Sequence, residues 1–402
     1  MNLAPKYHCS GCSACHDACP KGAIAMVADK EGFLYPRIDA ARCVNCGLCA
    51  RVCPSLNCSE PRKPLAVYAA KANDTELRHA SSSGGIFSLL ARQILAKGGK
   101  VFGAAFDKRD WSVEHIGVTD EAGLAELRGS KYVQSRTAGI YREVKTALET
   151  NLPVLFSGTP CQIAALRAYL NLSNSSNVSN LSNLYLVDVV CHGAPSPKVW
   201  QKYLDWQCEA ALAQGRGSAP AEGRNIRRIS FRHKNCGWKR FSLSLRFADD
   251  KEYLCQFPDD PFMQAFLKEL CNRPSCHDCQ CRELRSGSDL TIADFWGIDR
   301  VMPDFDDDRG ASLVLANTEK GSVLLNSVNL NIELRPSSLA DGVNGNTALV
   351  RSPIAHRNRA KFLKKCREKN FDKLVIRMLL PLLKVRLRSF LGRFVRKLGL
   401  RK

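Results

Sequence analysis

A cysteine motif that occurs twice near the start of the chain constrains the fold more than any other feature. The pattern is C-x2-C-x2-C-x3-C-P, and its two copies contain Cys9, Cys12, Cys15, Cys19 and then Cys43, Cys46, Cys49, Cys53. Two residues between successive thiolates let one loop cover three irons of a cubane, whereas the fourth thiolate points away and ligates the other cluster. We therefore predict two [4Fe–4S] clusters, one held by Cys9, Cys12, Cys15 and Cys53 and the other by Cys43, Cys46, Cys49 and Cys19.

A pair of zinc knuckles is the alternative interpretation of the same cysteines. Structural zinc sites favour two separated CxxC pairs, and neither copy of the motif has that form. The repeat instead resembles the bacterial two-cluster ferredoxin domain. The polar, proline-containing stretch at residues 59–64 reads as a linker, so we expect this domain to span residues 1–60.

The number of cysteines, 19 in 402 residues, raises the question of their redox state. The first ten residues lack a basic segment followed by an apolar one, which predicts a cytoplasmic protein. Thiols stay reduced in the cytoplasm, so clustered cysteines indicate metal or redox chemistry rather than disulfides.

A second cysteine group lies far downstream, in a polar loop that contains a proline. Its spacing is C-x4-C-x2-C-x-C, formed by Cys271, Cys276, Cys279 and Cys281. A structural zinc ion and a third iron–sulfur cluster are both compatible with this spacing; we favour the cluster because the chain already houses two. We predict Cys271, Cys276 and Cys279 as ligands, and leave the fourth open among Cys281, Cys161 and Cys191.

Between residues 65 and 345 the sequence alternates between apolar strands and amphipathic helices. Strands are predicted at 67–70, 101–106, 154–156, 184–190 and 290–295, with helices between several of them. This alternation predicts an α/β body, in two parts that meet near residues 180–225, where the chain becomes polar and low in complexity. The whole chain is thus expected to be α+β: a ferredoxin domain, a larger α/β body and a basic C-terminal tail.

Several short phrases of the body occur in a specific order, at residues 81–85, 129–135, 157–162, 191–196, 273–279 and 294–297. Together with the ferredoxin start, they resemble the coenzyme F420 hydrogenase/dehydrogenase beta-subunit family. The resemblance implies FAD bound beside an iron–sulfur centre in the body.

The residues of these phrases are compatible with a dinucleotide. Glycine-rich turns that open helices offer free amides and a positive dipole end to a phosphate, although such turns also cap helices in any α/β protein. With the resemblance, they predict FAD-binding residues Ser82, Ser83, Gly84, Gly85, Lys131, Tyr132, Gln134, Ser157, Gly158 and Thr159. There is no GxGxxG sequence, so the site is not of the Rossmann type.

Two further residues are candidates for chemistry near the flavin, because each follows an apolar strand at its carboxyl end. Cys161 starts a predicted helix, which would lower the pKa of its thiol, so it is either a cluster ligand or redox-active. His192 is positioned to protonate a reduced product, with capping of the strand end as the alternative.

The net charge of +20 is concentrated at the end of the chain. Residues 351–402 contain 18 Lys and Arg against two acidic residues, which leaves residues 1–350 nearly neutral. The pattern of residues 371–402 predicts a basic amphipathic helix that lies on an anionic membrane surface or packs on the body. Charges interrupt every apolar run, which excludes a membrane span, and no motif accompanies them to indicate nucleic-acid binding.

These features predict a cytoplasmic iron–sulfur flavoprotein oxidoreductase, peripheral on the membrane if the tail lies there. Electrons from a ferredoxin-like donor or a partner oxidoreductase subunit would pass through the clusters to FAD and then to an organic acceptor. The alternative is a non-catalytic electron-transfer subunit of a larger redox complex, for which the resemblance suggests a setting in bacterial polysaccharide metabolism.

Overall fold

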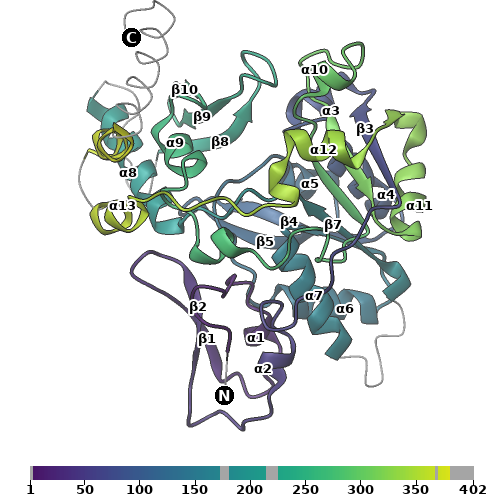
Figure 1. Cartoon of the computed structure of the whole chain (residues 1–402), viewed down its shortest axis with the longest axis vertical. Coiled ribbons are helices and arrows are strands. Elements are labelled where there is room, and N and C mark those ends of the chain that lie inside the picture. Colours follow the sequence, from purple (N-terminus) through teal and green to yellow (C-terminus); the bar gives the residue numbers. More distant parts are fainter. Residues whose placement is uncertain (1–2, 173–180, 214–224, 367–369, 381–402) are drawn as a thin grey trace, which may run out of the picture.

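The computed structural model describes residues 3–172, 181–213, 225–366 and 370–380. The N-terminal segment forms a small lobe of two short helices and one antiparallel hairpin, with α1 (Ala14–Asp17), β1 (Ile24–Ala28), β2 (Leu34–Ile38) and α2 (Leu48–Arg51). Figure 1 shows this lobe (purple) on one side of a larger α/β body.

One eight-stranded sheet forms the centre of the body. Its order is β13-β3-β12-β11-β7-β6-β4-β5, with β3 (Ala66–Ala72), β4 (Lys100–Asp107), β5 (Ser112–Val118), β6 (Val154–Gly158), β7 (Leu184–Val189), β11 (Leu290–Asp294), β12 (Ser312–Ala316) and β13 (Ile332–Pro336). The neighbours β11, β7, β6 and β4 run parallel, and the outer strands pair antiparallel. Strands from both sides of residues 180–225 therefore share one sheet.

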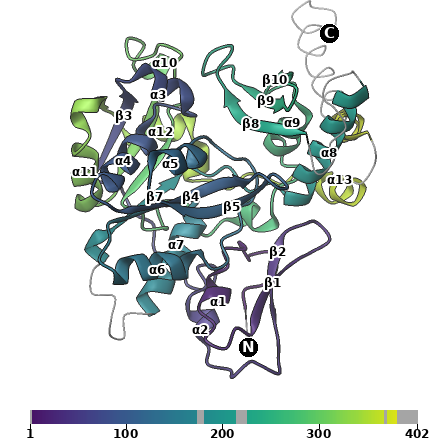
Figure 2. The same cartoon turned by 180° about the vertical axis from the view of Figure 1, so that it is seen from behind.

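Helices cover both faces of this sheet, as the strand–helix alternation predicts. One face packs on α3 (Thr75–Ala80), α4 (Ile86–Leu95), α5 (Glu121–Leu127) and α11 (Glu319–Asn326). The other packs on α6 (Ile140–Glu149) and α7 (Pro160–Leu172). Helix α1 of the N-terminal lobe contacts both α6 and α7, and Figures 1 and 2 show the lobe against that side.

The chain between β7 and β11 supplies a second, smaller unit. Here the antiparallel strands β8 (Ile226–His233), β9 (Ser242–Phe247) and β10 (Glu252–Gln256) pack with α8 (Pro197–Ala213) and α9 (Pro261–Leu267). The remaining short elements are α10 (Ile298–Val301), α12 (Leu339–Gly345), α13 (Arg359–Lys365) and 3-10 turns at Leu181–Asn183, Pro274–Asp278, Asn329–Asn331 and Thr347–Leu349.

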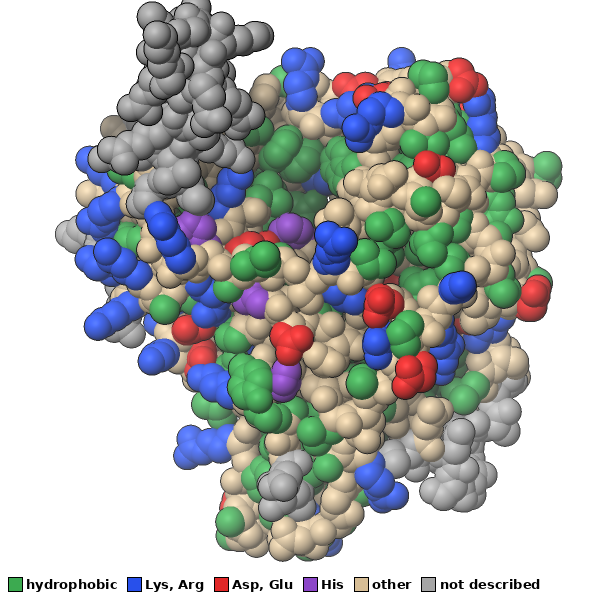
Figure 3. All heavy atoms as spheres, viewed as in Figure 1, with side chains coloured by type: hydrophobic (Ala, Val, Ile, Leu, Met, Phe, Trp, Pro, Cys, Tyr) green, Lys and Arg blue, Asp and Glu red, His purple; other side chains and the backbone are tan. Residues whose placement is uncertain are grey.

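The described part of the basic tail packs on this smaller unit. Residues 371–380 are helical, and their apolar side chains join the core around Trp200 and Tyr203 through Phe371, Leu374, Val375, Met378 and Leu379. Figure 3 shows Lys and Arg side chains gathered over the nearby α8 and α13. Residues 371–380 therefore pack on the body, which is one of the two predicted alternatives. The prediction of membrane contact now concerns residues 381–402, which lie outside the described residues. No helix among the described residues is long and apolar enough to cross a membrane.

The turn before α4 is packed against the sheet so closely that only glycine fits at residue 84. A Cβ atom on Gly84 would lie 2.5 Å from the carbonyl oxygen of Ala70 and 2.8 Å from Oγ of Ser312. We expect Gly84→Ala to reduce the free energy of unfolding by about 1–3 kcal/mol, because overpacking forces the backbone to shift. Urea unfolding checks this, with Gly103→Ala as the control, since a Cβ there meets Leu127 at 3.4 Å. Equal stabilities of the two variants would contradict the prediction.

Candidate iron–sulfur and cofactor site

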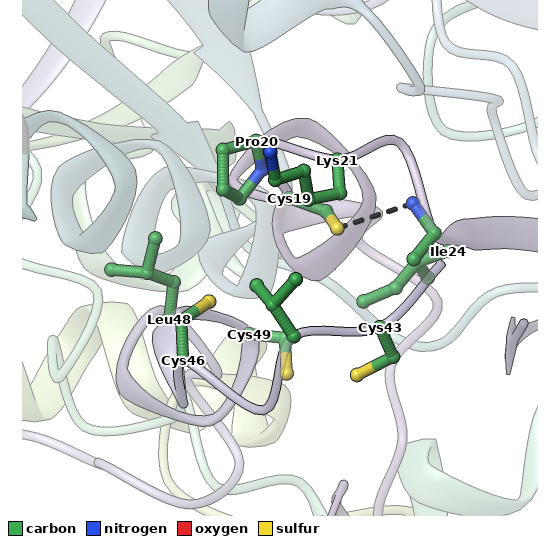
Figure 4. A pocket seen from close by; sticks show the side chains of 10 residues that line it. Cys19, Pro20, Lys21, Ile24, Cys43, Cys46, Leu48 and Cys49 are labelled. Atoms are coloured by element: carbon green, nitrogen blue, oxygen red, sulfur yellow. Dashed lines mark hydrogen bonds between the residues drawn. The ribbon is translucent and has the colours of Figure 1, made fainter. Parts of the chain in front are cut away.

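The structure gathers four cysteines of the N-terminal lobe around one small hollow. Cys19, Cys43, Cys46 and Cys49 line it together with Pro20 and Ile24, and Figure 4 shows their side chains around it. The backbone N–H of Ala23 donates a hydrogen bond to Sγ of Cys19, at 3.2 Å. Hydrogen bonds of this kind to cluster sulfurs tune the reduction potential. These are the residues predicted to hold one cluster, referred to below as the outer cluster.

The other four cysteines of the repeat lie close together on the side of the lobe that faces the body. Burial, reinforced by the nearby thiols of Cys9 and Cys53, raises the pKa of Cys15 to about 12. Burial likewise raises the pKa of Cys12, and the thiols of Cys15 and Cys53 add to the effect. This grouping is the one predicted for the second cluster, referred to below as the inner cluster.

The loops between the cysteines have the backbone conformation that wrapping around a cubane requires. In the first copy, Gly11 and Ser13 have positive φ angles of 70° and 63°, and in the second copy Asn45 and Gly47 have 54° and 76°. Left-handed residues at matching positions curl both loops in the same way. The residues present therefore fit two [4Fe–4S] clusters, with four thiols for each.

A third cysteine group lines a much larger cavity in the body. It consists of Cys161, Cys191, Cys276, Cys279 and Cys281. A hydrogen bond with Cys281 lowers the pKa of Cys279, and the thiolate is the form that binds metal. The backbone N–H of Ala194 donates to Sγ of Cys276, at 3.3 Å. In the parts of the chain that the structure describes, no three such side chains gather tightly around one ion, either here or in the N-terminal lobe.

The predicted ligand Cys271 does not belong to this group. It is fully buried in the apolar core of the smaller unit, and its charged and thiol neighbours are Glu269, Arg359 and Cys366. Folding instead brings in Cys161, Cys191 and Cys281, the three residues left open as the fourth ligand. We therefore replace Cys271 with members of this trio in the proposed ligand set.

The third cysteine group lies next to the inner cluster. The thiol of Cys161 is close enough to Cys12 to raise its pKa further, and Cys12 has the same effect on Cys281. For Cys12 burial is the larger cause of the raised pKa, and for Cys281 the hydrogen bond with Cys279, followed by burial, is larger. Cys12 of the N-terminal lobe therefore lies close to Cys161 and Cys281 of the body.

Arg273 joins these two centres and is fully buried. Its guanidinium donates to the carbonyl oxygen of Cys9 at 2.7 Å, that of Leu34 at 2.9 Å, and Oε1 of Gln134 at 2.9 Å. It also lies 3.8 Å from Sγ of Cys9 and 4.2 Å from the ring centroid of Tyr35. Arg273 is therefore a structural link between lobe and body, and a positive charge beside a cluster ligand.

The large cavity has a volume of about 850 Å³, which suits a cofactor. It opens at the carboxyl ends of β6, β7 and β11, where α/β proteins place their ligand sites. Nine of the ten predicted FAD-binding residues line it: Ser82, Ser83, Gly85, Lys131, Tyr132, Gln134, Ser157, Gly158 and Thr159. The exception is Gly84, which packs against β3 and β12 instead.

Two of these lining residues have roles that the sequence did not indicate. Gln134 bridges to the N-terminal lobe, because its side chain donates to the carbonyl oxygen of Ser10 at 2.9 Å and accepts from Arg273. Lys131 donates to three backbone carbonyls, and burial lowers its pKa to about 7. An anionic group bound beside Lys131 would favour its charged form.

Both candidates for chemistry line the cavity as well. Cys161 lies in the first turn of α7, with Sγ 3.2 Å from Oγ1 of Thr159. The predicted lowering of its pKa is wrong, because burial raises the pKa of Cys161 to about 11. Nε2 of His192 lies 2.6 Å from Oε1 of Glu269, and the His192 side chain is 42% exposed.

Sequence reasoning missed the wall of the cavity that the smaller unit supplies. Arg232 is buried there, 2.8 Å from Oδ1 of Asp294, with its guanidinium 3.9 Å from the ring centroid of Phe241 and 5.0 Å from that of Trp296. Its Nε has no hydrogen-bond partner among the described residues. An unpartnered buried donor on this wall fits a ligand with acceptor oxygens or nitrogens. The alternation of apolar residues at 229–231 predicts a strand from the sequence, but it stops short of Arg232 and does not indicate which side chains face a ligand.

His115 gives the cavity a pH-dependent contribution to stability. Its ring nitrogens contact Oγ of Ser135 and the carbonyl oxygen of Ser157, and burial, with Lys131 nearby, lowers its pKa to about 4. Below pH about 6.5 the His115 imidazole binds a proton in the unfolded chain, whereas in the folded protein it stays neutral until the pH approaches 4. We therefore expect the unfolding free energy to decrease on acidification, with about 1 kcal/mol lost between pH 6.5 and 5.5.

Anaerobic denaturant unfolding at pH 7.5, 6.5 and 5.5 measures this contribution. The matched variant is His115→Gln, which keeps a polar side chain but does not titrate. Its unfolding free energy should decline less steeply over the same range. Parallel declines in the two proteins would mean that His115 does not cause the pH dependence.

Comparison with known proteins identifies both parts of the chain. Residues 8–57 match the model of the 4Fe-4S dicluster domain, residues 67–141 the N-terminal model and residues 153–340 the C-terminal model of the coenzyme F420 hydrogenase/dehydrogenase beta subunit. An uncharacterized ferredoxin from Methanocaldococcus jannaschii is 43% identical over 53 residues, which cover 13% of this chain and 68% of that protein. A chain of the F420-reducing [NiFe] hydrogenase complex from Methanosarcina barkeri is 16% identical, with a TM-score of 0.48 over 71% of this chain and 91% of its own. The family models confirm the predicted resemblance.

Proposed function

Because the chain belongs to the coenzyme F420 hydrogenase/dehydrogenase beta-subunit family and carries a 4Fe–4S dicluster domain, we propose that it is an iron–sulfur flavoprotein oxidoreductase. Electrons would enter at the outer cluster and pass the inner cluster and a third cluster. They would then reach FAD in the large cavity.

The position of the third cysteine group carries this proposal. The group lies near Cys12, a proposed ligand of the inner cluster, on one side, and it lines the large cavity on the other. A [4Fe–4S] cluster takes one thiolate on each iron, so the five thiols of the group are sufficient. The proposed ligands are Cys276, Cys279 and two from Cys161, Cys191 and Cys281.

The cavity offers what FAD requires of a protein. FAD, when bound, supplies the exchange between one-electron and two-electron chemistry. The first amides of α4 and the hydroxyl of Ser82, which accepts hydrogen bonds from Ser130 and keeps its own proton to donate, would hold phosphate oxygens, whereas the hydroxyl of Ser83 already donates to the carbonyl oxygen of Ala311. Lys131 and Arg232 supply positive charge, and the rings of Phe241 and Trp296 supply apolar surface that excludes water.

The exposed end of His192 suits proton delivery to an acceptor in this cavity. Glu269 supplies a negative charge next to Nε2 of this ring. The same body serves different acceptors within the family. For the organic acceptor we therefore propose a position, on the side of the cavity where His192 lies.

Anaerobic purification with iron, sulfide, zinc and flavin quantified on one sample tests the proposal. We expect about twelve irons and one FAD per chain. Eight irons without flavin, even after reconstitution, would contradict it. That result would favour the alternative of an electron-transfer subunit docked to a partner enzyme, which the description of the family as a beta subunit also suggests.

Replacing Cys46, a proposed ligand of the outer cluster, tests the order of the path. We expect Cys46→Ser to lower the iron content by about four per chain and to abolish turnover driven by reduced ferredoxin. Cys58→Ser is the control, because Cys58 is exposed and lies outside the motif. Full ferredoxin-driven turnover in Cys46→Ser would show that electrons do not enter at this end.

A further inference from the structure

The two ends of the N-terminal lobe have different surroundings. The inner-cluster end is bonded to the body: the carbonyl oxygen of Cys12 accepts hydrogen bonds from Oγ1 of Thr137 and from the hydroxyl of Tyr141, both at 2.8 Å. The outer-cluster end faces solvent, because Cys46 is exposed and Val44 is 57% exposed. A protein that exchanges electrons with the lobe therefore finds the outer cluster accessible.

The hairpin of the lobe is also held by the body, so this orientation is defined at more than one place. The hydroxyl of Ser196 bonds to the carbonyl oxygen of Glu31, and the Glu31 carboxylate forms an ion pair with Arg359 at 2.8 Å. A Cβ on Gly32 would lie 2.4 Å from Cβ of Lys198, which shows how closely the two parts approach. Because the body holds the lobe both at Cys12 and at the hairpin, the end of the lobe that contains the outer cluster is directed away from the body.

The surface around the outer cluster is basic. Lys21, Arg42 and Arg51 are exposed, and the guanidinium of Arg42 donates to the carbonyl oxygen of Lys21 at 2.9 Å, which holds the two side by side. Within the described residues none of the three forms an ion pair with a carboxylate. Lys21 borders the outer-cluster hollow, Arg42 precedes Cys43, and Arg51 ends α2, which contains Cys49.

The acidic residues of the same lobe are mostly neutralised elsewhere. Asp29 pairs with Lys6 at 2.7 Å, Glu31 pairs with Arg359, and Asp17 is buried beneath α6. Asp39 is exposed and forms no ion pair with the residues that the structure describes. Asp39 lies beside Arg42 and offsets part of the charge, so the outer-cluster surface keeps a net positive charge from Lys21, Arg42 and Arg51.

We propose that this surface, formed by Val44 and Cys46 with Lys21, Arg42 and Arg51 around them, docks a small acidic one-electron carrier protein. The inference rests on the proposed function and specifies its electron donor. Opposite charge on the two partners steers their encounter, and an apolar centre such as Val44 allows close approach of the redox centres.

Charge reversal at Arg51 tests the docking surface, because the Arg51 side chain forms no hydrogen bond or ion pair with the described residues that this change would break. In stopped-flow mixing with reduced flavodoxin, an acidic carrier, we expect Arg51→Glu to slow cluster reduction about tenfold at low salt. The difference should shrink at high ionic strength, where screening removes the steering. Arg42→Glu should act in the same direction. Lys97→Glu, the same charge change on an exposed residue just after α4, should leave the rate unchanged.

The viologen radical cation separates charge effects from damage to the cluster. Because it is positively charged, its reaction should not be slowed by Arg51→Glu. If Arg51→Glu slowed the reactions with flavodoxin and viologen equally, the cluster of that variant would be damaged. The same result with Arg42→Glu as well would contradict the docking surface. Unchanged flavodoxin rates in both Arg variants would overturn it directly.

The same mixing experiment distinguishes failure of the docking surface from failure of the proposed function. Charge-dependent reduction of the clusters without any later reduction of FAD would support the docking surface and contradict the path to the flavin. Reduction of FAD at rates that do not depend on Arg42 or Arg51 would support the path and overturn the docking surface.

Discussion

Replacement of Cys276 by serine is expected to remove one cluster and to disconnect the flavin from the N-terminal clusters. Cys276 lines the large cavity, accepts a hydrogen bond from Ala194 and lies near the thiols of Cys161 and Cys279. Loss of this ligand should lower the iron content from about twelve to about eight per chain. Reduction of FAD by reduced ferredoxin should fall at least about a hundredfold, because the inner cluster then has no neighbouring centre.

Cys271→Ser is the matched control for this prediction. Cys271 belongs to the same sequence motif but lies in the apolar core, so its replacement should leave the iron content unchanged. Iron analysis and electron paramagnetic resonance of the reduced proteins measure both variants. If Cys276→Ser kept its iron and lost zinc instead, the third group would be a structural zinc site. Loss of iron in Cys271→Ser alone would restore the ligand set predicted from the sequence.

Removal of the charge on Arg273 is expected to lower the reduction potential of the inner cluster. Reduction adds one negative charge to a cluster, and a buried guanidinium 3.8 Å from Sγ of Cys9 stabilises that charge. Arg273→Gln should therefore shift the potential downward, by about 59 mV for each tenfold decrease in the equilibrium constant for one-electron reduction. The carbonyl oxygens of Cys9 and Leu34 also lose their donor, at a cost of about 1–3 kcal/mol for each group left unsatisfied.

Arg273→Lys separates the effect of charge from that of the hydrogen bonds. Lysine keeps the positive charge but lacks the planar guanidinium that reaches three acceptors at once. A redox titration followed by electron paramagnetic resonance should therefore show a smaller shift for Arg273→Lys than for Arg273→Gln. Identical potentials in the wild type and both variants would show that Arg273 is only a structural link.

The local contacts of this protein were predictable because they depend on spacing along the chain. The C-x2-C-x2-C loops need only a few consecutive residues to curl around a cubane, which is why the two groups of four cysteines could be proposed from the motif alone. Apolar strands such as 154–156 and 184–190 were predictable for a similar reason, since burial on both faces leaves a continuous apolar run. The phrases that follow them reach one cavity because parallel strands end at the same edge of the sheet.

The tertiary structure decided which distant residues meet. Sequence spacing placed Cys271 with Cys276 and Cys279, but packing directs it into the apolar core and brings Cys161 and Cys191 to the site instead. The roles of Arg232 and Arg273 were equally hidden, because an arginine on an alternating strand or in a polar loop usually faces solvent. Their burial depends on partners about 60 and 260 residues away along the chain, such as Asp294 and Cys9. Spacing therefore determined the chemistry of the N-terminal clusters, and only long-range packing determined what they connect to.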